Sequence, residues 1–346
     1  MPVTELAAMA RRAFVTPAGR TLAFTALGLG GAPLGNLGRA VTDADAEATL
    51  AAAWEAGVRY FDTAPLYGHG VSERRVGRAF IGRQRAEFLL STKVGRLLEP
   101  CAPGEEASGP YLKVPPLKVR FDYSRAGVLG SFEASRKRLR LDRVDILFVH
   151  DIEAATHGGR EGREARLAQL VDCGGWRALE ELRAAGDVGA IGLGVNETEA
   201  CERFLEVADP DLFLLAGRYT LLEQQPLERL FPRCRERGVW VIAGGPFNSG
   251  VLARAGGTYD YAAAPTAVVD KVRRLEAVCA AHDADVRAAA LQFPLAHPRV
   301  ATVLAGAQTP GEARGNAAMI AAPLPASLWS DLKGEGLIAA EAPTPC

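Results

Sequence analysis

The sequence predicts an eight-stranded (β/α) barrel, a closed parallel sheet surrounded by helices. Eight short apolar runs rich in Val, Ile, Leu and Phe recur along the chain, and amphipathic stretches separate most of them. Continuous apolar runs suit strands that are buried on both faces, as parallel sheets require. The longest segments that contain Gly and Pro follow strands, which is typical of the barrel face that holds an active site.

The expected elements alternate along the chain. The expected strands are residues 22–28, 58–63, 88–93, 144–150, 188–195, 212–216, 239–243 and 301–305. The expected helices are 43–56, 72–80, 125–140, 176–185, 198–207, 227–237 and 312–320. A β-hairpin is expected ahead of the barrel at 11–23, and extra helices before the last strand at 270–282 and 287–297. The long segments 95–123, 151–175 and 246–266 are expected to wall the pocket.

Residues with capping chemistry stand at several helix ends. Thr42 or Asp43 is expected to open the first helix, and Ser72, directly before Glu73, the second. Glycines directly follow three of the expected helices, at Gly57, Gly186 and Gly238, just before the next strand. The helix-to-strand turns are therefore short, in contrast to the long segments after the strands.

A doubly wound α/β sheet is the competing architecture, because alternation of strands and helices alone does not distinguish it from a barrel. That fold usually carries the glycine pattern G-x-G-x-x-G after its first strand. The segment Gly28-Leu29-Gly30-Gly31-Ala32-Pro33 does not match this pattern, which favours the barrel.

Composition indicates one compact domain over residues 1–346 with a small-molecule partner. Hydrophobic residues make up 48% of the chain and the formal net charge is −1. Without a basic or acidic excess, there is no electrostatic reason to expect nucleic acid or an anionic membrane as a partner. The composition leaves the oligomeric state open.

The cysteines and apolar runs point to the cytoplasm. The six cysteines are scattered, and we expect them to be reduced thiols and not a metal or redox site. The apolar stretch at residues 6–10 is too short for a signal peptide, and no run reaches the roughly 20 residues of a membrane span.

Three expected strands end in polar residues that a barrel core would not otherwise select: Asp62, Lys93 and His150. All three should meet at the carboxyl-terminal mouth, with Tyr67 on the loop after Asp62. A lysine favours the phenolate of a nearby tyrosine, so we expect Lys93 to lower the pKa of Tyr67. Such a tyrosine can exchange protons with an alcohol or a carbonyl. The alternative is that Asp62 and Lys93 form only a structural ion pair.

Three segments carry a resemblance to a known family. Residues 61–68 read FDTAPLYG, residues 91–95 read STKVG, and residues 148–151 read FVHD. In order and spacing they resemble the signatures of the aldo-keto reductases across most of the chain. The resemblance implies that Tyr67 transfers a proton, that Asp62 and Lys93 tune it, and that His150 orients the substrate oxygen. It also implies direct hydride transfer to or from a nicotinamide cofactor.

The same resemblance implies a set of cofactor contacts. They are Asn196 for the nicotinamide carboxamide, Gly244, Pro246 and Phe247 after the seventh strand, and Gly306, Ala307, Gln308, Glu312 and Asn316 after the eighth. The sequence departs from the family at Ala216, where relatives have Gln, and at Gly244, where they have a stacking aromatic residue. Phe247 is the expected substitute. The alternatives are that Asn196 only satisfies its own turn and that the last loop only caps a helix.

Further runs, including residues 192–197, 215–224 and 244–250, resemble the branch of aldose 1-dehydrogenases and pyridoxal 4-dehydrogenases. This resemblance implies oxidation of L-fucose or a D-threo-aldose to its lactone. Alternatives are oxidation of pyridoxal, general carbonyl reduction, or a regulatory barrel that binds the cofactor without catalysis. The expected cofactor is NAD, with NADP also possible, because Glu312 stands where a cation would bind the 2′-phosphate of NADP.

Overall fold

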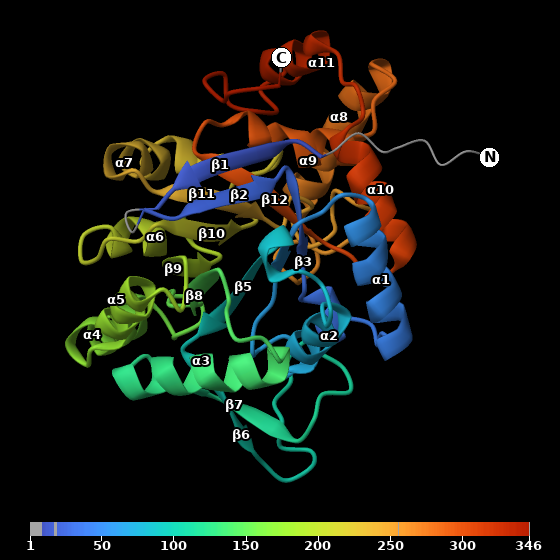
Figure 1. The fold of residues 1–346 in the computed structure, drawn as a ribbon. Coiled ribbons are helices and arrows are strands. Elements are labelled where there is room, and N and C mark those ends of the chain that lie inside the picture. Colours follow the sequence, from blue (N-terminus) through green and yellow to red (C-terminus); the bar gives the residue numbers. More distant parts are fainter. Residues whose placement is uncertain (1–8, 17–18, 255, 346) are drawn as a thin grey trace.

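Eight parallel strands close into a barrel in this computed structural model, which describes residues 9–16, 19–254 and 256–345 (Figure 1). The strands pair around the barrel in chain order, and the last pairs with the first. They are β3 (Leu27–Gly30), β4 (Tyr60–Asp62), β5 (Leu89–Val94), β8 (Ile146–His150), β9 (Ala190–Val195), β10 (Leu212–Ala216), β11 (Trp240–Gly244) and β12 (Val300–Gly306). The predicted fold class is confirmed.

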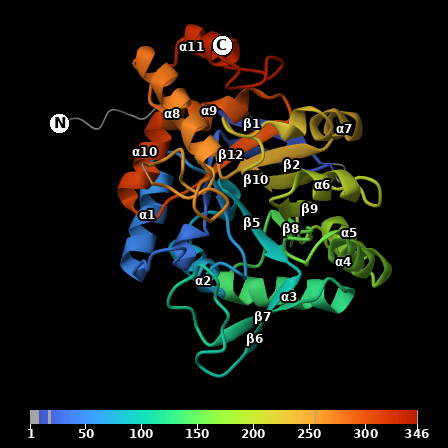
Figure 2. The ribbon, with the colours of Figure 1, turned by 180° about the vertical axis from the view of Figure 1, so that it is seen from behind.

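Helices surround the barrel on its outer face (Figures 1 and 2). They are α1 (Asp43–Glu55), α2 (Val71–Ala79), α3 (Arg125–Leu139), α4 (Arg160–Asp172), α5 (Gly175–Ala185), α6 (Thr198–Phe204), α7 (Leu230–Arg237), α8 (Thr266–Ala281), α9 (Val286–Gln292), α10 (Pro310–Ile320) and α11 (Ala326–Gly334). The sequence did not predict α4 or α11. Helix α4 buries only Arg163, Leu167 and Leu170 along one narrow stripe, so its sequence reads as a polar segment.

A β-hairpin closes the end of the barrel at which the strands begin. Strands β1 (Arg11–Val15) and β2 (Thr21–Thr25) pair antiparallel, as predicted. Phe14, Leu22 and Phe24 of this hairpin share one buried apolar cluster with residues at the starts of the barrel strands. The single strand predicted at 22–28 was wrong, because this run covers the end of β2 and the start of β3. Both strands are buried, so the apolar run hides the break between them.

The long segment after β5 forms a second hairpin, β6 (Arg96–Pro100) paired with β7 (Leu117–Phe121). It lies beyond α3 in Figures 1 and 2. Between these strands the chain returns to the loop after β3, where Leu112 N donates to Asn36 O at 3.1 Å. This contact brings Tyr111 to the side of Tyr67, with ring centroids 6.3 Å apart. The segment therefore contributes to the barrel mouth, as its position after a strand predicted.

The helix ends agree with the sequence at most positions. Thr42 is the N-cap of α1, and its hydroxyl accepts a hydrogen bond from Asp45 N at 3.1 Å. Gly186 and Gly238 end their helices in the left-handed conformation. Ser72 was wrong as a helix start, because Gly70 precedes α2 and Ser72 lies inside it. The Ser72 hydroxyl instead donates to Gly31 O at 2.7 Å and ties α2 to the end of β3.

Two further features of the described residues are the state of the cysteines and the length and hydropathy of the helices. The five cysteines within the described ranges are all free, and Cys346 lies outside those ranges. None of the described helices is both long and apolar enough to cross a membrane. Most of the apolar stretch at residues 6–10, which the sequence indicates is too short for a signal peptide, lies outside the described residues.

Two helical glycines should respond in opposite ways to substitution by alanine. A Cβ on Gly77 of α2 would lie 2.1 Å from Leu139 O, whereas one on Gly130 of α3 would meet only a Leu97 methyl group at 3.9 Å. We expect Gly77→Ala to lower the free energy of unfolding by about 1 to 3 kcal/mol through overpacking. Gly130→Ala should raise it by about 0.5 to 1 kcal/mol, since alanine favours the helix. Urea unfolding of both variants checks this, and equal effects would contradict the close packing of α2 against α3.

Candidate active site

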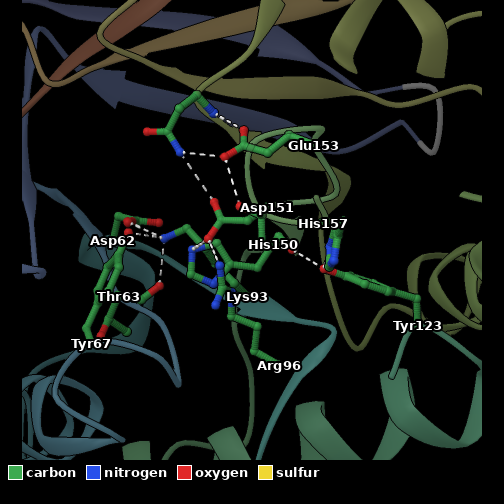
Figure 3. Close-up of polar contacts among 12 residues, drawn as sticks. Asp62, Thr63, Tyr67, Lys93, Arg96, Tyr123, His150, Asp151, Glu153 and His157 are labelled. Carbon is green, nitrogen blue, oxygen red and sulfur yellow. Dashed lines mark hydrogen bonds and ion pairs between the residues drawn. The ribbon is translucent and has the colours of Figure 1, made fainter. Parts of the chain in front are cut away.

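The four predicted catalytic side chains meet at the carboxyl-terminal mouth of the barrel. Asp62 is the last residue of β4, and His150 is the last residue of β8. Lys93 lies near the end of β5, the strand between them. Tyr67 follows in the loop between β4 and α2, and Figure 3 shows it on the same side of Lys93 as Asp62. The structure thus brings together residues that are up to 88 positions apart, from 62 to 150.

Lys93 organises this group because its ammonium hydrogens all have partners. Its Nζ lies 2.6 Å from Asp62 Oδ2, 3.0 Å from Thr63 O and 3.0 Å from Tyr67 OH. Lys93 is 1% exposed, so water does not compete for these contacts. The second oxygen of Asp62 accepts from Ser91 Oγ at 2.7 Å. A buried charge pair needs this degree of hydrogen bonding to offset its lost hydration.

The proton affinity of Tyr67 differs from the sequence-based prediction. Burial, followed by the nearby Asp62 carboxylate, raises the pKa of Tyr67 well above its ordinary value. The prediction that Lys93 lowers this pKa was therefore wrong for the protein without ligand. The main physical reason is that burial disfavours the charged phenolate, and in addition Asp62, 2.6 Å from the Lys93 ammonium, offsets the positive charge that would favour it. Tyr67 is accordingly a phenol that can donate its proton.

His150 is neutral in this environment. Burial, and then the positive charges of Arg96 and Lys93, hold the pKa of His150 well below its ordinary value. Its ring approaches the Tyr67 ring edge-on, with centroids 5.8 Å apart. A neutral imidazole carries one N–H donor and one acceptor, so His150 can donate a hydrogen bond to a substrate oxygen held near Tyr67.

Two glycines set the position of the Tyr67 loop. A Cβ on Gly35 would lie 2.5 Å from the carbonyl carbon of Tyr67, and one on Gly68 would lie 2.3 Å from Gly35 O. Gly68 also has a φ of 64°, in the left-handed region. The loop after β4 therefore packs directly against the turn after β3. This contact positions the phenol without any side chain between the two segments.

A carboxylate holds the predicted nicotinamide contact Asn196. Glu153 accepts from Asn196 N at 2.5 Å and from Asn196 Nδ2 at 3.1 Å. Burial, and then the charge of Asp151, raise the pKa of Glu153 to about 7. The Asn196 side-chain oxygen is not part of these contacts, since Nδ2 faces Glu153. Asn196 is thus held in one orientation with an amide oxygen free to accept.

The two residues at which the sequence differs from the family pattern, Ala216 and Gly244, lie side by side. Ala216 at the end of β10 pairs with Gly244 at the end of β11. A Cβ on Gly244 would lie 3.4 Å from the Ala216 Cβ. Pro246 is buried, and the half-buried Phe247 packs against the hydrophobic core. Two small residues therefore line this part of the mouth. A nicotinamide ring placed here would contact the backbone and not a large side chain.

The turn after β12 has the form of a cradle for a ligand. Gly306 is exposed at the end of β12, and Asn316 Nδ2 donates to its carbonyl oxygen at 3.3 Å. A Cβ on Gly315 would meet nothing within 4 Å, and one on Gly311 only the Thr309 hydroxyl at 3.9 Å. The bare backbone at the N-terminus of α10 suits a phosphate group. The buried Ala307 can contribute only its backbone to such a site.

Glu312 and Gln308 have structural contacts in this turn. Thr309 is the N-cap of α10 and accepts from Glu312 N at 3.1 Å, while Glu312 Oε2 accepts from Gln308 N at 2.7 Å. Gln308 Nε2 donates to Leu37 O at 2.7 Å. Glu312 therefore caps the helix, as the alternative interpretation of this loop expected. Its carboxylate still places a negative charge beside the exposed glycines.

Sequence reasoning missed three polar residues at the mouth: Arg96, Asp151 and Glu153. Arg96 comes directly after Gly95 at the end of β5, and Asp151 directly after His150. The signal that could have found them was a charged residue one to three positions beyond a strand end. Across the described residues, no group of three His, Cys, Asp or Glu side chains is arranged to hold a metal ion.

Comparison with known proteins gives concordant matches. A family model described as the aldo/keto reductase family matches residues 26–334. The chain is 41% identical to a pyridoxal 4-dehydrogenase of Microbacterium luteolum, covering 92% of this chain and 96% of that protein. It is 40% identical to a D-threo-aldose 1-dehydrogenase of a Pseudomonas species, covering 94% and 96%. Among solved structures, aldo-keto reductase AKR11C1 from Bacillus halodurans in its holo form has a TM-score of 0.73 at 26% identity, covering 96% and 98%.

The raised pKa of Glu153 should make stability depend on pH. Its folded pKa of about 7 exceeds the unfolded value near 4.3, so the folded protein binds this proton more tightly. The stabilisation is complete below pH 4 and is lost as the pH rises through about 7. We expect the free energy of unfolding to fall by about 3 kcal/mol between pH 4 and pH 7, and Glu153→Gln to remove that slope.

Urea unfolding at a series of pH values measures this slope. The matched control is Glu164→Gln: against the effect of partial burial, hydrogen bonds from Arg163 and Arg203 lower the pKa of Glu164. This control should keep the wild-type slope between pH 5 and pH 7. An identical slope in wild type and Glu153→Gln would show that Glu153 is not protonated in the folded protein.

Proposed function

The chain belongs to the aldo/keto reductase family, and on this premise we propose that it oxidises an aldose at C1 to its lactone with NAD as acceptor. The observation that carries the reaction type is the contact of Lys93 Nζ with both Asp62 and the Tyr67 hydroxyl at the barrel mouth. L-Fucose or a D-threo-aldose is the proposed substrate, which follows the printed name of the Pseudomonas relative.

Oxidation of pyridoxal is the second candidate, because the Microbacterium relative is as similar as the aldose dehydrogenase. A barrel that binds cofactor only for regulation is less consistent with the geometry. Such a protein needs the cofactor loops, but it has no need for a phenol 3.0 Å from a buried lysine. We therefore keep pyridoxal oxidation and general carbonyl reduction as alternatives within the same chemistry.

Proton transfer in this proposal belongs to Tyr67. Its hydroxyl exchanges a proton with the substrate oxygen, while His150 donates a hydrogen bond to the same oxygen. Lys93 and Asp62 hold the phenol in place and supply a local field that is screened from water. An oxidised nicotinamide held here would supply the hydride acceptor, and before the transfer its ring would carry a positive charge near the phenol. That charge favours the phenolate needed for oxidation, against the raised pKa of Tyr67 in the protein alone.

The proposed cofactor contacts fall into two groups. Asn196, Gly244, Pro246 and Phe247 would surround the nicotinamide at the mouth. The turn after β12 would hold the adenosine end of NAD through Gly306, Ala307, Gln308, Glu312 and Asn316, with the Glu312 carboxylate accepting from the free ribose hydroxyls. The exposed glycines and the oriented amide of Asn196 support this assignment, since both leave polar atoms accessible on the mouth side of the barrel.

Replacing Tyr67 by Phe should reduce kcat by a factor of about 10² to 10⁴, because a positioned proton donor is lost. The affinity for NAD should stay nearly constant, since the phenol is assigned to the proton and not to the cofactor. The measurement combines NADH production from L-fucose with identification of the lactone product. Retention of wild-type kcat by Tyr67→Phe would remove Tyr67 from the mechanism, and absence of lactone in wild type would remove aldose oxidation.

The preference for NAD over NADP should depend on the charge of Glu312. Its carboxylate lies at the exposed turn after β12 and would repel a 2′-phosphate. We expect wild type to favour NAD, and Glu312→Arg to shift the ratio of kcat/KM values toward NADP by roughly tenfold or more. Glu312→Gln is the matched control, because it keeps the capping shape without either charge, and it should shift the ratio less. A wild type that prefers NADP would overturn this assignment.

A further inference from the structure

A second buried ion pair lies next to the proposed catalytic group and has no part in proton transfer. Arg96 Nη2 contacts Asp151 Oδ2, and both side chains are almost fully buried, at 11% and 12% exposure. Asp151 Oδ2 also lies 3.4 Å from Nε2 of His150. Figure 3 shows Asp151 and Arg96 around His150, beside Lys93. The pair therefore borders the position proposed for the reacting oxygen.

The backbone turns at Asp151 so that two consecutive side chains share one side. In a continuing strand the side chains of His150 and Asp151 would point to opposite faces. Asp151 instead has a φ of 48°, in the left-handed region, and its N–H donates to Gly194 O at 2.9 Å. Aspartate tolerates this conformation better than most residues. The result is a carboxylate beside the imidazole at the mouth.

The pair retains unused hydrogen-bonding capacity. Within the described part of the chain, the one contact of Asp151 Oδ1 is a long one, 3.5 Å from Asn196 Nδ2. Arg96 Nε is closed off from solvent, so a bound group would have to use the terminal nitrogens of the guanidinium, which keeps 11% of its side chain exposed. The guanidinium is fixed over the Phe121 ring at 4.7 Å, so it does not turn away to another partner. A carboxylate and a guanidinium side by side thus offer an acceptor and donors to one bound group.

The chemistry of the pair selects a neutral hydroxyl group. The opposite charges of the pair cancel locally, so an anionic group gains little from Arg96. A hydroxyl can donate to Asp151 and accept from Arg96 at the same time. The oxygens of a vicinal diol are about one hydrogen-bond length apart. His150 and Asp151 have a comparable separation, so they can hold two such neighbouring oxygens.

On the basis of the proposed function, we propose that Asp151 and Arg96 bind the hydroxyl on the carbon next to the reacting carbon. This hydroxyl is the C2 hydroxyl of an aldose. The pair then determines specificity for 2-hydroxy carbonyl compounds and their cyclic hemiacetals. The ring of Tyr111, 6.3 Å from that of Tyr67, borders the same region of the mouth.

Two substrate pairs test this role. Lactaldehyde and propanal, reduced with NADH, differ only by the 2-hydroxyl group, and L-fucose is compared with its 2-deoxy analogue in oxidation. A hydrogen bond to a charged group predicts a wild-type preference in kcat/KM of roughly 10- to 100-fold for the hydroxylated member. Asp151→Ala should reduce this preference to less than about threefold. Asp151→Asn keeps the shape of the side chain and should give an intermediate preference.

The ratio between paired substrates separates recognition from a merely structural role. A loss of His150 orientation in Asp151→Ala would lower activity on both members equally and leave the preference unchanged, which would overturn the proposal. Glu153→Gln is the matched control, since it removes a carboxylate of the same network that contacts Asn196, and it should keep the wild-type preference. A wild type without any preference also overturns it. Preference for lactaldehyde without oxidation of L-fucose would support the subsite while rejecting aldose oxidation.

Discussion

The ion pair between Lys93 and Asp62 is the interaction on which the site depends. An ammonium and a carboxylate inside a barrel cost several kcal/mol of hydration each, which only close contact and complete hydrogen bonding offset. The structure meets both conditions, since Lys93 Nζ has three oxygen partners and Asp62 has a further hydroxyl donor. The third oxygen partner of Lys93 is the Tyr67 hydroxyl. The position of the reactive phenol is therefore a consequence of satisfying a buried charge.

The alternation of side chains along β5 connects this interior pair to the helix layer. Lys93 points into the mouth, whereas the preceding Thr92 donates to Glu73 Oε1 of α2 at 2.7 Å. Glu73 is fully buried, and its other oxygen accepts from Arg138 of α3 at 2.5 Å. The strand that carries Lys93 is thus held from both faces by buried charges. Removing one partner from either set would leave an unpaired charge in the protein interior. Mutual pairing therefore explains why the interior tolerates these residues here.

The sequence predicted the parts of the molecule that follow from local patterns. Strand ends were readable because Asp62, Lys93 and His150 interrupt apolar runs, and a barrel brings such ends together. The break between β2 and β3 was not readable, because both are buried and the run is continuous. The pKa of Tyr67 and the partners of Arg96 depend on distances between segments far apart in sequence. Spacing along the chain does not contain those distances, so the second ion pair was missed.

Charge balance across the mouth explains how these features act together. Lys93 with Asp62 and Arg96 with Asp151 are two paired sets of opposite charge, and the imidazole between them is neutral. The mouth therefore has little net charge of its own, apart from Glu153, whose raised pKa favours the neutral form below pH 7. In such an environment a single added charge changes the proton affinity of Tyr67 strongly, because few mobile charges or waters screen it. The protein supplies geometry and a neutral background, and the redox state of a bound nicotinamide would then decide whether the phenol gives or takes its proton.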